Sequence, residues 1–89
     1  MLKISQIRSA RQSVTLRLEG RIVGPWVDEA HETCERILAE GRAVNLNLAE
    51  VSFVDQDGVR FLKNLVHRGG VLSGCSLFVE EQLKSSPVD

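Results

Sequence analysis

The sequence has few of the features that indicate a secreted, metal-binding or membrane-spanning protein. Its 89 residues include two cysteines, Cys34 and Cys75, and their spacing fits neither a metal-ligand cluster nor a disulfide framework. The N-terminal segment carries Lys3, Arg8 and Arg11, so it lacks the apolar centre of a signal peptide. No apolar run approaches the roughly 20 residues of a membrane-spanning helix. We therefore expect a cytoplasmic protein with no direct membrane insertion.

Charge of one sign and aromatic residues are also scarce. The chain has 11 Lys and Arg against 12 Asp and Glu, a net charge of -1, which gives no general attraction to phosphate backbones or anionic lipid. It has no tyrosine, one tryptophan and three phenylalanines. One predicted helix carries the cations Arg60, Lys63 and Arg68, but no aromatic residues are interleaved with them to form a nucleic-acid site. We therefore expect no nucleic-acid partner.

The composition that is present is typical of one globular domain. Hydrophobic residues make up 43% and charged residues 26% of the chain, as in ordinary folded proteins, and this length leaves room for a single core. We place the domain at residues 1–84 and expect residues 85–89 to be a flexible tail. Cys34 and Cys75 fall where a free thiol packs as a small hydrophobe, although a bridge between them stays open.

Hydrophobic periodicity predicts strands that alternate with helices. The predicted elements are hairpin strands beginning near Leu2 and Val14, a helix that starts at Pro25 and is stopped by Gly41, a strand over 43–51, a helix over 56–67, a strand over 71–75 and a short helix over 77–84 capped by Ser76. In the second helix we expect four residues to face inward, namely Val59, Leu62, Leu65 and Val66. This order implies an α/β fold with a small mixed, largely parallel β-sheet of about four strands and helices in the crossover connections.

The segment VSFVDQDGVRFL, residues 51–62, changes from a strand pattern to a helix pattern at its centre. Asp55 is placed to cap the helix by accepting a backbone N–H, and Val54 and Val59 have the spacing of a hydrophobic staple. Gly58 lies in the first turn, where glycine weakens a helix by roughly 0.5–1 kcal/mol relative to alanine. We expect another backbone, or a partner, to approach it closely.

These motifs together resemble a STAS domain, the fold of bacterial anti-sigma-factor antagonists that also occurs in stressosome and transporter subunits. The resemblance covers about residues 12–84. It rests on Val14–Gly20, the helix from Pro25, the strand Asn45–Leu48 and above all Phe53–Val59, FVDQDGV. It implies a STAS-like fold and a non-enzymatic protein-interaction domain in transcription regulation, without a cofactor.

The family motif usually reads Asp-Ser-(Ser/Thr/Ala)-Gly-Leu, and a partner kinase phosphorylates its first serine. By position, Asp55, Gly58 and Val59 match the aspartate, glycine and leucine, whereas Gln56 stands at the phosphorylated serine and Asp57 follows it. A phosphoserine adds about -1.5 to -2 charges, whereas Gln56 adds none and Asp57 one. We therefore favour a corner that is always competent to bind. A built-in phosphomimic at Asp57, or a domain that never meets a serine kinase, stays open.

The expected partner surface is a loop over residues 52–58 with the exposed side of the helix that follows. Its residues are Ser52, Asp55, Gln56, Asp57, Gly58, Arg60 and Lys63. The resemblance implies a partner such as an anti-sigma factor of kinase fold. The alternative is a structural subunit of a larger stressosome-like or transporter-associated assembly. Because the family usually continues through a further strand and helix, we expect either a sheet edge open to pairing, for example in a homodimer, or an edge covered by the tail.

The two main helices differ in charge. The first carries five carboxylates, Asp28, Glu29, Glu32, Glu35 and Glu40, and the second carries Arg60, Lys63 and Arg68. Such faces are usually solvated. They can also steer association between copies, or of the second helix onto an acidic partner.

Other residue groups do not indicate an enzyme. A metal or phosphoryl-aspartate site at Asp55 and Asp57 needs further carboxylates from a neighbouring strand, and only Glu19 is available. His31 and His67 lie on different predicted helices without a nucleophile at suitable spacing. We expect no catalytic residue, metal or cofactor.

Overall fold

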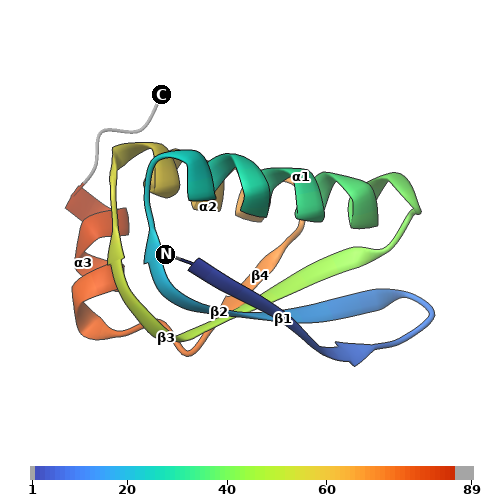
Figure 1. Cartoon of the computed structure of the whole chain (residues 1–89). Helices are drawn as coiled ribbons and strands as arrows, with labels where there is room; N and C mark the ends of the chain where they lie inside the picture. Colours follow the sequence, from blue (N-terminus) through green and yellow to red (C-terminus); the bar gives the residue numbers. More distant parts are fainter. Residues whose placement is uncertain (1, 86–89) are drawn as a thin grey trace.

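A computed structural model describes residues 2–85, apart from the side chains of Phe78 and Ser85 (Figure 1). The chain forms β1 (Leu2–Ser9), β2 (Ser13–Ile22), α1 (Pro25–Ala39), β3 (Ala43–Val54), α2 (Gln56–His67), β4 (Val71–Ser73) and α3 (Leu77–Ser85). The helices begin where the sequence signals predict. Pro25 is the first residue of α1, and the Ser76 Oγ accepts the Val79 N–H at 3.2 Å at the start of α3.

The four strands form one sheet in the order β1-β2-β3-β4. β1 and β2 pair antiparallel, whereas β2 with β3 and β3 with β4 pair parallel. In Figure 1, α1 and α2 run along the same side of the sheet and α3 stands at one end beside β3. The mixed, largely parallel α/β fold predicted from the sequence is confirmed.

The core lies between the sheet and the helices. Its strand residues alternate along the two central strands and pair across them, with Val14 opposite Val44 and Leu16 opposite Leu46. The residues between them, such as Thr15 and Asn45, lie on the other face of the sheet and are partly exposed. Among the residues whose burial the structure describes, no polar or charged residue is buried. The helices therefore cover the apolar face of the sheet, and its polar face stays open.

The prediction that Val66 faces inward is wrong. Val66 is 48% exposed, whereas Phe61 is only 6% exposed. The Phe61 ring meets the His31 ring of α1 edge-on, with centroids 6.2 Å apart. Because α1 covers this flank of α2, the buried face is rotated toward Phe61 and Val66 is left on the opposite flank.

β3 extends to Val54, beyond the predicted end at Val51. Two register shifts against β2 break the simple alternation, so that Val51 and Val54, three residues apart, are both buried. β4 is shorter than predicted and ends at Ser73, because Gly74 turns the chain with φ 68°. On the side of β3 that faces β4, the residues after Asn47 have no strand partner in the described chain, whereas on the other side β2 stays paired up to Val54.

The C-terminal helix is attached to the end of this β3 edge. The Gln82 side-chain amide donates to the Val54 carbonyl oxygen at 2.7 Å. Among the described residues, therefore, α3 covers part of the sheet edge that β4 leaves unpaired. Whether this edge pairs with a second copy stays a prediction.

Both cysteines are free. Cys34 is buried as expected, and Cys75 is only half-buried. Burial, with a smaller effect of the Glu35 carboxylate, raises the pKa of the Cys34 thiol to about 11. Cys34 is therefore a protonated packing residue at neutral pH.

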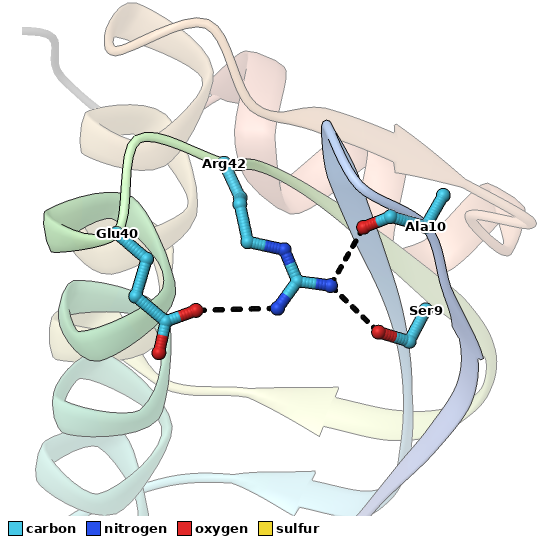
Figure 2. Close-up of polar contacts among 4 residues, drawn as sticks. All are labelled: Ser9, Ala10, Glu40 and Arg42. Carbon is cyan, nitrogen blue, oxygen red and sulfur yellow. Dashed lines mark hydrogen bonds and ion pairs between the residues drawn. The ribbon is translucent and has the colours of Figure 1, made fainter.

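Arg42 joins the β1–β2 hairpin to the connection between α1 and β3 (Figure 2). One guanidinium nitrogen, Nη2, donates to the Ser9 Oγ at 2.6 Å and to the Ala10 carbonyl at 2.7 Å. The other, Nη1, pairs with the Glu40 carboxylate at 3.2 Å. Since β2 and β3 both start here, Arg42 fixes the end of the sheet that is opposite the Asp55 corner.

We expect Arg42→Met to lower the free energy of unfolding by about 1–2 kcal/mol, because it removes the charge-assisted hydrogen bonds that hold the hairpin. Urea unfolding followed by circular dichroism measures this change. Arg36→Met is the matched control, since Arg36 is exposed on α1 and a change there is usually within about 0.5 kcal/mol. Equal losses for the two variants would show that the Arg42 contacts add no net stability.

Candidate functional site

Asp55 is the N-cap of α2, as the sequence predicts. Its backbone is extended, with φ -84° and ψ -176°, and its Oδ1 accepts the Gly58 N–H at 2.8 Å. Its carbonyl oxygen accepts the Val59 N–H at 2.9 Å, the first helical bond. The helix therefore begins at Gln56.

The second carboxylate oxygen of Asp55 makes a contact that the sequence does not indicate. Oδ2 accepts the Gly24 N–H at 2.9 Å, across 31 positions of sequence. The Asp55 N–H also donates to the Ile22 carbonyl at 3.1 Å. One side chain thus joins the turn between β2 and α1 to the turn between β3 and α2. Gly24 has φ 51°, a conformation that suits glycine.

Gly58 is explained by a close approach of the chain itself. A Cβ at this position would lie 2.6 Å from the Ile22 carbonyl oxygen and 2.6 Å from the Val54 Cγ1. Gly58 is buried, so it packs against the ends of β2 and β3 and is not part of the exposed surface of the corner. The sequence predicted that either another backbone segment or a partner would approach Gly58 closely. The structure shows that a backbone segment does so, at Ile22.

The predicted loop over residues 52–58 is not a loop. β3 continues through Val54 and α2 starts at Gln56, so Asp55 alone separates them. The reason is that the parallel ladder with β2 continues to the pair Ile22–Val54 and the Asp55 cap starts the helix immediately. The candidate site is therefore a strand-to-helix corner.

Gln56 and Asp57 lie on the surface of this corner, and both are exposed. Asp57 pairs with Arg60 at 3.5 Å, and both side chains are 67% exposed. An ion pair of this exposure contributes little stability. Gln56 thus occupies the first exposed position of the helix.

Ser52 and Phe53 extend the candidate site along β3. Ser52 lies at a register shift between β2 and β3 and is exposed, and its Oγ donates to the Gly20 carbonyl at 3.2 Å. Phe53 lies within the predicted 52–58 surface, although it was not named among the individual site residues, and it is 39% exposed. The sequence signal for Phe53 is an aromatic residue two positions before the capping aspartate. Which face of the sheet its side chain lies on depends on the register shift.

The exposed side of α2 carries Arg60 and Lys63, as predicted; Arg60 is exposed and Lys63 is half-buried. Arg68 does not belong to this side, because it pairs with Glu35 of α1. The hydrogen bond from Arg68 holds the pKa of Glu35 below its usual value. The positive side of α2 is therefore formed by Arg60 and Lys63, with His67 one turn further on.

The carboxylates do not gather into a metal site. Both oxygens of Asp55 accept backbone N–H groups, and Glu19 pairs with Arg17 at 3.5 Å. In the part of the chain that is described, no three His, Cys, Asp or Glu side chains lie close enough to hold a metal ion. His31 is exposed beside Glu35, at 3.4 Å. A search of the same residues for a helix long and apolar enough to cross a membrane finds none.

Known structures share this fold. SpoIIAA, an anti-sigma factor antagonist solved in its unphosphorylated form, has 18% sequence identity and a TM-score of 0.70, over 98% of this chain and 88% of that chain. The STAS domain of an antisigma-factor antagonist from Rhodobacter sphaeroides has 15% identity and a TM-score of 0.64, over 98% of this chain and 96% of that chain. A match to Mglu, with 21% identity and a TM-score of 0.64, covers 84% of this chain but only 20% of that one.

The sequence comparisons agree with the structural ones. No curated protein matches the chain. The family model for the STAS domain matches residues 4–87, almost the full length. The chain therefore belongs to the STAS domain family.

Proposed function

We propose that this STAS domain is a non-enzymatic module that binds a protein partner through the Asp55 corner and the exposed side of α2. The observation that carries the proposal is the exposed Gln56 at the first position of α2, on a corner that Asp55 fixes through two backbone N–H groups. A surface that is ordered before binding loses less conformational entropy when the partner docks.

The partner class we propose is an anti-sigma factor of kinase fold. This follows from the family resemblance and is supported by the two structural relatives described as anti-sigma-factor antagonists. Binding would sequester the anti-sigma factor in the cytoplasm and release a sigma factor for transcription. The site residues would be Ser52, Asp55, Gln56, Asp57, Arg60 and Lys63, with the buried Gly58 in support.

In this proposal, binding is not switched off by phosphorylation at the corner. A glutamine side chain has no hydroxyl to accept phosphate, and it leaves the helix start uncharged. A phosphoserine there would add about -1.5 to -2 charges next to Asp57, which already carries one. Like charges that face a partner cost binding energy, so Gln56 keeps the corner in the binding state.

The test starts with affinity purification of the tagged protein from its own organism, followed by binding measurements with the purified partner. We expect a complex with a kinase-fold protein whose Kd is unchanged by Mg²⁺ and ATP. For Gln56→Ser we expect ATP to weaken the complex at least about tenfold, or 1.4 kcal/mol.

Gln56→Ala is the control, since it removes the amide without supplying a hydroxyl and is expected to be insensitive to ATP. ATP-dependent phosphate elsewhere on the wild-type chain, with loss of binding, contradicts the proposal. Recovery of the protein in a large particle or a membrane fraction, without a kinase-sized partner, supports the alternative of a structural subunit.

A further inference from the structure

An apolar groove lies between α2, β4 and α3, away from the Asp55 corner. It has a volume of about 300 Å³ and is lined by Leu62, Lys63, Val66, Leu72 and Leu83. Leu62 is fully buried at its base, and Leu72 and Leu83 are partly buried. Val66, the residue expected in the core, is instead 48% exposed on its wall. An exposed apolar concavity of this kind is typical of a binding site.

A row of polar side chains that includes the two cations Arg60 and Lys63 accompanies the groove along α2. Gln56, Arg60, Lys63 and His67 follow one another at intervals of four, three and four residues, so they lie on one side of the helix. Over these eleven steps the helix rises roughly 16 Å, or about three turns. Lys63 belongs to both the row and the groove wall. The row therefore connects the Asp55 corner to the groove.

α3, which contributes Leu83 to the groove, does not carry the same charge as α2. α3 contributes two carboxylates, Glu80 and Glu81, and one ammonium group, Lys84. The positive side of the groove is thus α2, and an occupant with carboxylates along one edge is attracted to that side.

We propose that the groove receives an amphipathic α-helix of the protein partner, with its apolar side in the groove and its carboxylates facing α2. The inference rests on the proposed function and specifies the chemistry of the partner. Helices that dock into grooves place apolar side chains at intervals of three and four residues, and a volume near 300 Å³ accommodates a few such side chains. Three turns of partner helix would reach from Val66 to the corner.

A second copy of the chain fits the groove less well. Its α1 is acidic, but the apolar side of that helix, formed by Val27, Ala30 and Cys34, is buried against its own sheet. The α1 helix of a second copy therefore has exposed carboxylates but no exposed row of apolar side chains to place in the groove. The partner helix is therefore expected to come from another protein.

The test uses a labelled 16-residue peptide designed as an amphipathic helix, with leucine at every third or fourth position and glutamate along one flank. We expect fluorescence anisotropy to show binding at least about tenfold tighter than for the same peptide with lysine in place of glutamate. The difference should shrink in 0.5 M salt, because salt screens the charges. A peptide of identical composition in scrambled order should bind weakly.

Val66→Glu should weaken binding of the acidic peptide at least about tenfold. Ile7→Glu is the matched control, because Ile7 is similarly exposed, at 46%, on the opposite edge strand of the sheet. Circular dichroism verifies that both variants fold. Equal binding of acidic and scrambled peptides, equal affinity of the Val66→Glu variant and wild type, or NMR shifts confined to residues outside α2, β4 and α3 would each overturn the proposal.

The two proposals fail separately. A native complex that survives Val66→Glu but is lost with Gln56→Trp, which blocks the corner without changing its charge, overturns the groove and leaves the corner in place. Groove-dependent peptide binding, together with a native complex that is insensitive to Gln56→Trp, overturns the proposed function.

Discussion

Asp55→Ala is expected to lower the free energy of unfolding by about 2–3 kcal/mol. Loss of an aspartate N-cap costs typically about 1 kcal/mol and up to about 2. Here the substitution also removes the bond from Oδ2 to the Gly24 N–H, which contributes about 0.5–1.5 kcal/mol more. Urea unfolding monitored by circular dichroism measures the total. A loss of this size is a large fraction of the stability of a small domain.

Asp57→Ala is the control for charge at the same helix terminus. Asp57 lies two residues further along, but it is exposed and pairs only weakly with Arg60, so we expect a change of less than about 0.5 kcal/mol. The loss of stability in Asp55→Asn should be smaller than in Asp55→Ala and larger than in Asp57→Ala. The reason is that the asparagine amide has one acceptor oxygen for the two backbone N–H donors. If Asp55→Ala and Asp57→Ala had equal stability, the link between the two turns would be energetically unimportant.

Gly58→Ala is expected to destabilise the domain by a net amount of about 1–2 kcal/mol, the opposite of the usual effect in a helix. Inside a helix, alanine is normally favoured over glycine by about 1 kcal/mol. At this position the added Cβ would lie 2.6 Å from the Ile22 carbonyl oxygen and 2.6 Å from the Val54 Cγ1, and relieving this overlap means shifting the buried ends of β2 and β3. Overpacking of this kind typically costs 1–3 kcal/mol.

Thermal unfolding of Gly58→Ala should show a fall in Tm of roughly 4–16 °C, since each kcal/mol corresponds to about 4–8 °C in a domain of this size. Asn64→Ala is the matched control, because Asn64 is exposed on the same helix and alanine there improves helix propensity without a clash. Its Tm should stay level or rise slightly. A Gly58→Ala variant as stable as wild type would mean that the two strand ends yield to the methyl group at no cost.

These two residues hold the corner in place from within the chain. Asp55 and Gly58 are engaged with the chain's own backbone, in the bonds to Gly24 and in the close approach of Ile22. Gln56 and Asp57 lie on top of this support and are exposed. The supporting residues and the surface residues are thus adjacent in sequence but differ in role. The functional proposal therefore concerns Gln56, whereas the stability predictions concern its neighbours.

Several features were predictable because they depend on residues close together in the chain. The start of α1 at Pro25 and of α2 at Gln56 follow from capping and helix preferences within one turn. The alternation of Val14, Leu16 and Leu18 predicts a half-buried strand from its period alone. The cap by Ser76 was also predicted and is confirmed.

The wrong predictions concern features that depend on contacts with residues far away in the sequence. Val66 and Phe61 both fit an apolar helix face, and only the position of α1 against Phe61 determines which one is buried. The length of β3 depends on register shifts against β2, and a register shift changes which side chains face the core. Neither can be obtained from local periodicity.

The sequence by itself determined the order of strands and helices and the cap at Asp55, because these depend on residue type and short spacing. Only the tertiary structure decided that Asp55 also binds the Gly24 N–H, that the Ile22 backbone forces glycine at position 58, and that Val66 lines a groove with Leu72 and Leu83. The physical reason is that parallel pairing of β2 with β3 and the packing of α2 against α3 bring together groups far apart in the chain, and local sequence patterns do not encode such contacts.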